Sequence, residues 1–151
     1  MDIVFNFPMT FTSDSDYVRN AYTLHELLNC QTAINVQYLR HHPDTIPLYQ
    51  SGVRYGRTQV WERLPEIYLP NKRKYFNSKY YSPGDLPGAR IADCKSLGPL
   101  RAAELIVSGR SAICQFRFIP RLDDTGNLDF HILLITDNGY EEDPSRVLGM
   151  R

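Results

Sequence analysis

Three residues whose types could do acyl-transfer chemistry follow one another along the chain: Cys94, His131 and Asp143. A thiolate is a strong nucleophile, an imidazole can take the thiol proton, and a carboxylate can orient the imidazole. We therefore expect Cys94 to attack an amide carbonyl and form a thioester, with His131 as the base and Asp143 as the orienting acid. This chemistry requires a fold that brings the three side chains to one place.

The element expected to carry Cys94 is a helix that follows it and runs to about Ser108, where Gly109 is a typical C-terminal residue. Its predicted buried side consists of Leu100, Ala103, Ile106 and Val107.

The start of this helix has two possible positions. If the helix begins at Cys94, Pro99 falls in its second turn and cannot donate a hydrogen bond to Lys95. If Ser96 caps the helix instead, Pro99 lies in the first turn, where proline is tolerated, and Cys94 lies on the preceding loop. In the first case the helix N-terminus, together with a neighbouring imidazolium, is expected to lower the pKa of the Cys94 thiol.

The C-terminal part is predicted to be an antiparallel meander that carries His131. A strand is expected over 111–119, with Cys114 in its inward row, and a second strand over 128–136. A third strand or extended arm should then lead into Asp143.

The turn at 137–139 decides whether Asp143 can reach His131. A two-residue loop at Asn138 and Gly139 puts Asp143 on the wrong face of the sheet. A three-residue loop, with Gly139 in the left-handed conformation, pairs Leu133 with Asp143 and makes His131 its diagonal neighbour. We expect the three-residue loop.

The N-terminal part is predicted to hold a short strand at 3–7 and one long helix. Thr23 and Glu26 have the spacing of a capping box that opens this helix, which should end near His41. Cys30 should be a packed residue within it. The expected buried side consists of Leu24, Leu27, Leu28, Ile34 and Tyr38.

The middle of the chain, 43–90, holds most of the prolines and is expected to form irregular loops with one or two short elements. The stretch 72–81 mixes basic and aromatic residues, a composition that could contact single-stranded nucleic acid. We favour a solvated loop there and consider a nucleic-acid partner unlikely on charge grounds, because the 17 basic residues are balanced by 17 acidic ones.

Composition sets the remaining bounds. A chain of 151 residues is long enough for one domain with its own core. No apolar run reaches the roughly 18–20 residues that span a membrane, and the N-terminus lacks signal-peptide features, so we expect a cytosolic protein without membrane association. The three cysteines should be free thiols, and they lack the paired spacing of a zinc site; we expect neither metal nor cofactor.

Several stretches together resemble small phage-encoded transglutaminase-like proteins of the papain-like cysteine protease superfamily. They are ADCKSLGPLRAAELIVSG at 92–109, FHILLITDNGYEEDPSRVLGM at 130–150, PLYQSGVRYGR at 47–57 and WERLP at 61–65. The resemblance implies one α+β domain over 1–151 with a transglutaminase-like, papain-like fold. Its parts would be an N-terminal helix, a loop-rich middle with an insertion at 70–88, and a nucleophile-bearing helix followed by an antiparallel sheet.

By motif, the resemblance implies a Cys-His-Asp triad of Cys94, His131 and Asp143, with Trp61 as an oxyanion or substrate-wall candidate. It also implies a protein or peptide substrate, phage structural proteins among the partners, and a place in the host cytoplasm or in the virion. The chain departs from the family pattern around the nucleophile, where Lys95-Ser96 replaces an acidic pair. A catalytically inactive phage structural or assembly protein that keeps the fold is therefore the alternative.

Overall fold

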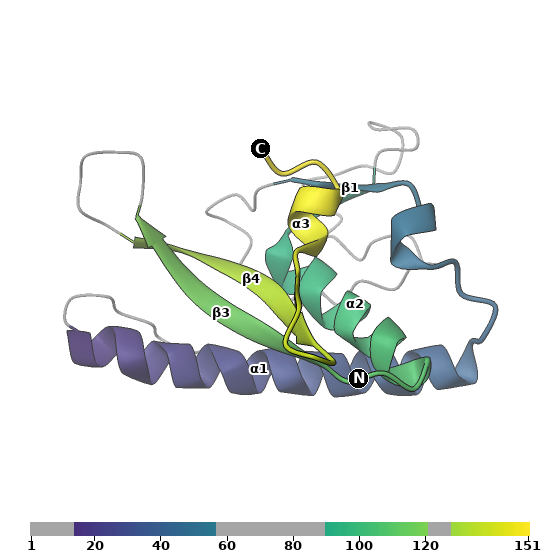
Figure 1. Ribbon diagram of the computed structural model, residues 1–151, viewed down its shortest axis with the longest axis horizontal. Helices are drawn as coiled ribbons and strands as arrows, with labels where there is room; N and C mark the ends of the chain where they lie inside the picture. The colour runs from purple at the N-terminus through teal and green to yellow at the C-terminus, as the bar shows by residue number, and fades with distance from the viewer. Residues whose placement is uncertain (1–13, 57–89, 121–127) are drawn as a thin grey trace, which may run out of the picture.

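The computed structural model describes residues 14–56, 90–120 and 128–151, and Figure 1 shows how its elements are arranged. In chain order they are α1 (Asp14–His41), the 3-10 helix η1 (Leu48–Gln50), β1 (Val53–Tyr55), β2 (Arg90–Ala92), α2 (Cys94–Val107), β3 (Ala112–Pro120), β4 (Leu128–Thr136), β5 (Glu141–Glu142) and α3 (Pro144–Val147). The fold is a small α+β structure in which a helix is followed by a three-stranded antiparallel sheet, as the C-terminal pattern predicts.

Helix α1 begins earlier than the sequence pattern predicts. It starts at Asp14 and continues through Thr23, so the predicted capping box lies inside the helix and the prediction is wrong. The Thr23 hydroxyl donates to the carbonyl of Arg19, 3.2 Å away, one turn back. A threonine hydroxyl can be satisfied in this way within a helix, so it need not mark a start. The predicted end at His41 is confirmed.

Only part of α1 is covered by the rest of the fold, which explains two wrong predictions about its buried side. Leu28 is buried, as expected, and so are Val36 and Leu39. Ile34 is 48% exposed and Cys30 is also exposed. Cys30 lies two positions after Leu28, and two positions turn a helix by about 200°, which points its side chain away from the core.

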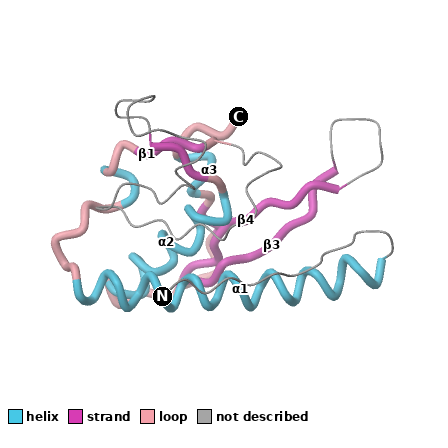
Figure 2. The backbone as a smooth tube through the Cα atoms, turned by 180° about the vertical axis from the view of Figure 1, so that it is seen from behind, coloured by secondary structure: helices cyan, strands magenta, loops and turns pink. Residues whose placement is uncertain are grey.

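Helix α2 lies at the centre of the fold, beside α1 in both backbone views (Figures 1 and 2). It begins at Cys94, with Asp93 as the N-cap, so Pro99 lies within the helix. The predicted end is correct, because Ser108 is the C-cap. Val107 is 42% exposed, contrary to the predicted buried side. The buried residues are Cys94, Ser96, Leu97, Gly98, Pro99, Leu100, Ala102, Ala103 and Leu105.

Gly98 allows α2 to approach the sheet closely. A Cβ atom at this position would lie 2.9 Å from Cγ2 of Ile132 and 3.6 Å from Sγ of Cys114. The first distance is shorter than a carbon–carbon contact allows, since such contacts are optimal at about 3.5–4.0 Å. The absence of a side chain at Gly98 therefore sets how near α2 comes to β4.

Strands β3 and β4 pair antiparallel along their full lengths, with Cys114 opposite Leu134. As predicted, Cys114 belongs to the buried row of β3, which alternates with exposed residues such as Ile113. Strand β5 pairs with β4 only at Leu134 and Ile135.

The turn between β4 and β5 is the predicted three-residue loop. Leu134 pairs with Glu142 and Ile135 with Glu141, a register that brings Asp143 level with Leu133. Gly139 has a φ of 73° and Asn138 a φ of 62°, so both adopt the left-handed conformation. The prediction about this turn is confirmed.

A second, smaller sheet pairs β1 with β2 in parallel. The N–H of Tyr55 also donates to the carbonyl of Leu148, which ties β1 to the C-terminal segment. The predictions for 3–7, for 72–81 and for the insertion at 70–88 lie outside the described residues.

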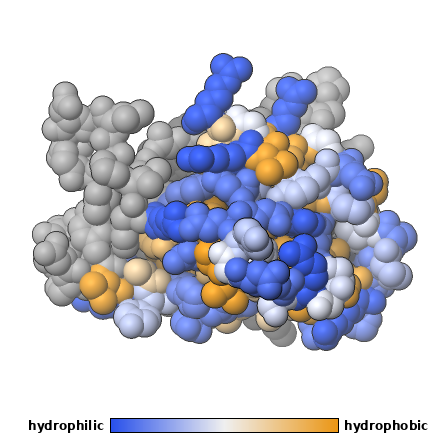
Figure 3. Space-filling view, in the orientation of Figure 1, coloured by the Kyte–Doolittle hydropathy of each residue, from blue (hydrophilic) through white to orange (hydrophobic). Residues whose placement is uncertain are grey.

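The buried side chains form two clusters that share α2. The first joins α2 to α1 and β1, and the second joins α2 to α1, β3 and β4 and contains Cys94 and Cys114. On the face seen in Figure 3, hydrophobic residues are scattered among hydrophilic ones. In the described parts of the chain, no helix combines the length and hydropathy that crossing a membrane requires.

Candidate active site

The N-terminus of α2 positions Cys94 as the first helical residue. The Asp93 carboxylate caps the helix by accepting the N–H of Lys95 at 3.0 Å, and it also pairs with the Lys95 ammonium group. The first N–H groups of a helix have no partner within it. The Cys94 N–H is one of these, and it acts on the sulfur of the same residue, where it lowers the thiol pKa.

The Cys94 thiol is buried, with 7% of the residue exposed. Burial raises its pKa to about 11, and the negative charge of Asp93 adds to this, while the backbone N–H of Ile132 and the charge of Lys95 act in the opposite direction. The expectation that the helix N-terminus lowers the pKa of the Cys94 thiol is therefore wrong. Desolvation outweighs the groups that stabilise the thiolate. The thiol is protonated at neutral pH.

His131 and Asp143 are in direct contact, as the triad hypothesis requires. Nε2 of the imidazole lies 2.8 Å from Oδ2 of the carboxylate, and both side chains are largely buried. An ionised carboxylate can only accept a hydrogen bond, so a neutral imidazole in this contact carries its proton on Nε2 and has its lone pair on Nδ1. This tautomer leaves Nδ1 as the nitrogen that can act as a base.

Asp143 also caps the short helix α3, which helps to hold its side chain in place. Its Oδ1 accepts the backbone N–H of Arg146 at 3.1 Å, which makes Asp143 the N-cap of α3. The Arg146 side chain also lies near the carboxylate, with Nε 3.4 Å from Oδ2. The two oxygens thus have different hydrogen-bond partners: Oδ1 accepts the backbone N–H of Arg146 in α3, and Oδ2 contacts Nε2 of His131.

The thiol meets the histidine strand at the edge of β4. Strand β5 ends at Glu142, so no strand of the described sheet pairs with that edge at Ile132. The Ile132 N–H acts on the Cys94 sulfur, which places the sulfur beside the peptide group that joins His131 to Ile132. Among the described residues, no hydrogen bond links the thiol to the imidazole ring.

The structure thus brings Cys94 to the backbone of His131 and joins His131 to Asp143. Trp61, the oxyanion or substrate-wall candidate, lies outside the described residues. Two polar features near the site have no counterpart among the sequence-based candidates. One is the network of Tyr49, Arg101, Glu104 and Glu142, described below. Its only sequence signal is the i, i+3 spacing of Arg101 and Glu104. The other is Cys114, which the sequence placed in the strand but not beside Cys94.

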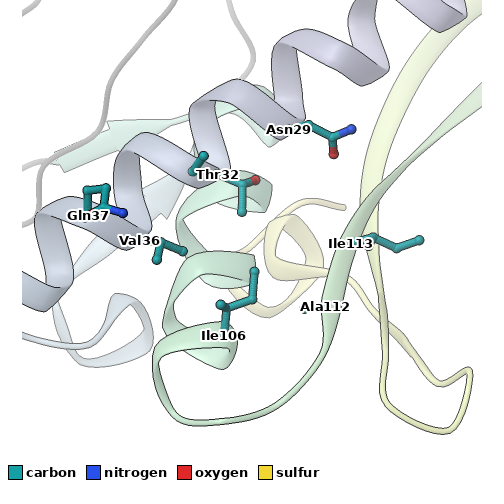
Figure 4. Close-up of a pocket in the computed structure, with 8 residues that line it drawn as sticks. Asn29, Thr32, Val36, Gln37, Ile106, Ala112 and Ile113 are labelled. Atoms are coloured by element: carbon teal, nitrogen blue, oxygen red, sulfur yellow. The ribbon is translucent and has the colours of Figure 1, made fainter.

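A groove of about 370 Å³ opens elsewhere, between α1, the end of α2 and the start of β3 (Figure 4). Its lining consists of Asn29, Thr32, Ala33, Val36, Gln37, Ile106, Ala112 and Ile113. None of the three triad candidates belongs to this lining, so the groove is not the site of the proposed chemistry.

Comparisons of the chain with protein-family models, with curated proteins and with solved structures found no match.

Proposed function

We propose that this chain is a cysteine-dependent acyl-transfer or amide-hydrolysing enzyme, of the transglutaminase-like or cysteine-peptidase type, that acts through a thioester on Cys94. The observation that carries the proposal is the 2.8 Å contact between His131 and Asp143, at the strand edge that the Cys94 thiol touches. A nucleophile, a base and an orienting acid are the parts that this chemistry needs.

In the proposed reaction, Nδ1 of His131 takes the thiol proton while the Cys94 sulfur attacks the carbonyl carbon of an amide. The carbon–nitrogen bond then breaks, and His131 returns the proton to the leaving amine. The Cys94 N–H is a donor available for the oxyanion that forms in between. Water or an amine then releases the acyl group from sulfur, which gives hydrolysis or transamidation.

The raised pKa of Cys94 defines how the nucleophile must form. At neutral pH a thiol with a pKa of about 11 is ionised to only about one part in ten thousand. A preformed thiolate–imidazolium pair is therefore not the resting state, and proton transfer to His131 accompanies attack. Successive residues of a strand point to opposite faces, so His131 faces away from Ile132, which packs in the Cys94 cluster. The proposed step therefore requires the imidazole to come within reach of the sulfur when substrate binds.

The biological setting that we propose follows from the resemblance to phage-encoded transglutaminase-like proteins. The acyl donor would be a protein or peptide, with phage structural proteins among the candidates. The enzyme would act in the host cytoplasm during infection or in the virion, without a cofactor.

One observation favours a second candidate, a catalytically inactive structural or assembly protein with the same fold. Cys94 is buried, its pKa is raised to about 11, and no hydrogen bond joins it to His131 among the described residues. A core thiol in a protein without catalysis would have the same properties.

Acetylation by p-nitrophenyl acetate distinguishes the two candidates. The thiol attacks the ester carbonyl and p-nitrophenolate leaves, which can be followed by absorbance, while mass spectrometry locates the acetyl group. The experiment uses a Cys30→Ser background, because Cys30 is exposed. We expect the acetyl group on Cys94 and, for His131→Ala, a rate about 10²–10⁴-fold lower near neutral pH.

Cys94→Ser should abolish the adduct and serves as the control for labelling elsewhere. If Cys94 reacts no faster than free cysteine, or if His131→Ala leaves its rate unchanged, the enzyme hypothesis is wrong and the structural protein is the better account.

A further inference from the structure

A half-buried polar network lies between α2, η1 and β5. Nε of Arg101 donates to Oε1 of Glu142 at 2.6 Å, and its Nη1 donates to Oε2 of Glu104 at 3.0 Å. The Tyr49 hydroxyl donates to the same Glu142 oxygen at 2.5 Å, and the guanidinium carbon lies 4.7 Å from the centre of the Tyr49 ring. The other oxygen of Glu104 accepts the N–H of Leu48 at 2.5 Å. Arg101 therefore joins three elements through one side chain.

The charges of this network are matched and partly shielded from water. Burial acts against the charged form of Arg101, but its hydrogen bonds to Glu142 and Glu104 more than offset this, so its pKa is raised. Charge-assisted hydrogen bonds of a planar guanidinium are strong and directional. The geometry of Glu142 is thus fixed relative to α2.

Strand β5 has few other contacts there: Arg117 of β3 pairs with Glu141, and Thr136 donates to the carbonyl of Tyr140. The strand consists of two residues and pairs with β4 only at Leu134 and Ile135. A strand this short contributes few backbone hydrogen bonds, and strands usually have about five or six residues. Asp143 follows Glu142 directly in the chain. The position of Glu142 therefore constrains the backbone position of Asp143, the proposed orienting acid.

The other end of the connection is the helix that carries the nucleophile. Arg101 lies seven residues after Cys94 on α2, which is about 10 Å along one helix. Because a helix of this length moves as one body, a tie between Arg101 and Glu142 also fixes Asp143 relative to Cys94.

We infer that Arg101 is a positioning residue for the His131–Asp143 pair, holding Asp143 in reach of the imidazole through the tie to Glu142. This inference rests on the proposed function, because a positioning role has meaning only if the pair acts on Cys94. Arg101 itself touches none of the three triad candidates in the hydrogen bonds described.

The test measures acetylation of Cys94 by p-nitrophenyl acetate near neutral pH in the full chain with Cys30→Ser. Arg101→Met should lower the rate about tenfold to a hundredfold, because small displacements of a catalytic group have effects of this size. Glu142→Gln, which is milder for folding, should lower it in the same direction. Arg101→Lys should recover only part of the loss, because an ammonium group cannot reproduce both guanidinium hydrogen bonds and the stacking on Tyr49. Arg40→Met is the matched control and should leave the rate unchanged, because Arg40 is exposed in the last turn of α1.

Two readouts separate positioning from a merely structural role. The first is iodoacetamide labelling of the buried Cys114, which should stay protected if the fold is intact and increase if Arg101→Met loosens the core. The second is a double-mutant cycle with Asp143→Asn. If Arg101 acts through Asp143, the double variant should be no slower than Asp143→Asn alone.

The outcomes are distinguishable. Slower acetylation with Cys114 protected and non-additive variants supports the inference. Additive losses, or a loss that appears only together with Cys114 labelling, overturn it while the proposed function stands. If His131→Ala does not slow acetylation, the proposed function fails and the inference fails with it.

Discussion

Cys94 and Cys114 lie in the same buried cluster, but their polar neighbours differ. Burial raises the pKa of both thiols, to about 11 for Cys94 and about 12 for Cys114. Cys94 begins a helix, is flanked by the charge of Lys95 and receives the Ile132 N–H. Cys114 lies within a strand, and the polar group acting on it is the Thr32 hydroxyl, 3.9 Å away.

The comparison shows that burial and reactivity are separate properties in this fold. Desolvation acts on both sulfurs and makes both poor nucleophiles at rest. Among the described residues, the groups that could stabilise a thiolate at Cys94 are backbone N–H groups and the charge of Lys95, whereas Cys114 has the Thr32 hydroxyl. A candidate nucleophile is therefore identified here by its neighbours and not by its own pKa.

The largest effect that we expect is a loss of stability at alkaline pH. The pKa of each buried thiol is higher in the folded chain than the ordinary value of 9.0, so folding favours the protonated form. The stabilisation is fully present below pH 9 and is lost as the pH rises through the folded values of about 11 and 12. By about pH 11, the ionisation of each thiol should lower the free energy of unfolding by on the order of 2 kcal/mol.

Urea unfolding at several pH values measures this loss. Cys94→Ala and Cys114→Ala should each remove part of the alkaline slope, and Cys30→Ala, at an exposed position, should not. Equal slopes in all three variants would contradict the assignment of the slope to buried thiols.

The second effect separates the two thiols. Asp143→Asn keeps a side chain that can cap α3 but removes the charge that holds the imidazole, so acetylation of Cys94 near neutral pH should fall about a hundredfold. The rate of p-nitrophenolate release measures this change. Iodoacetamide labelling of Cys114 should stay the same, and a parallel change at both thiols would mean that the variant acts by loosening the core.

The third effect concerns Gly98, which lies between the two thiols. Gly98→Ala would place a methyl group 2.9 Å from Ile132 Cγ2, so α2 and β4 must separate, and we expect a loss of about 1–3 kcal/mol in unfolding free energy. Thermal or urea unfolding measures it. Gly109→Ala is a less suitable control because Gly109 has a φ of 83°, whereas Val107→Ala tests a substitution at an exposed position of α2 and should change stability little.

The smallest effect is a change in the titration of Cys94 alone. Asp93→Asn keeps a capping side chain but removes the negative charge that raises the Cys94 pKa, so its alkylation profile should move to lower pH by about one unit or less. The profile of Cys114 should not move. A shift of both profiles would show that Asp93 acts through the stability of the cluster.

The sequence allowed good predictions wherever local chemistry decides structure. Gly139 can adopt the left-handed conformation that the three-residue loop needs, but the sequence permitted either loop, and the three-residue one was expected because it brings Asp143 to His131. Gly109 likewise identifies the end of α2, and alternation identifies the buried row of β3 with Cys114.

The errors arise where contacts between distant residues determine the structure, or where one local motif has two structural meanings. The start of α1 was placed at Thr23 because a hydroxyl that caps a helix and one that bonds inside it look alike in sequence. The exposure of Cys30 depends on how much of α1 the rest of the fold covers. The parallel pairing of β1 with β2 joins three-residue strands far apart in the chain, and the raised pKa of Cys94 depends on burial by several elements.

The two different contacts of the Asp143 carboxylate affect what an aspartate at this position says about function. Because one oxygen starts a helix while the other meets the imidazole, an acidic residue here has an architectural reason to persist. A protein with this fold and no catalytic activity would still gain stability from this aspartate. The presence of this aspartate is therefore weak evidence for activity. The Cys94 sulfur does not cap a helix, so the loss of Cys94 would be more informative about activity.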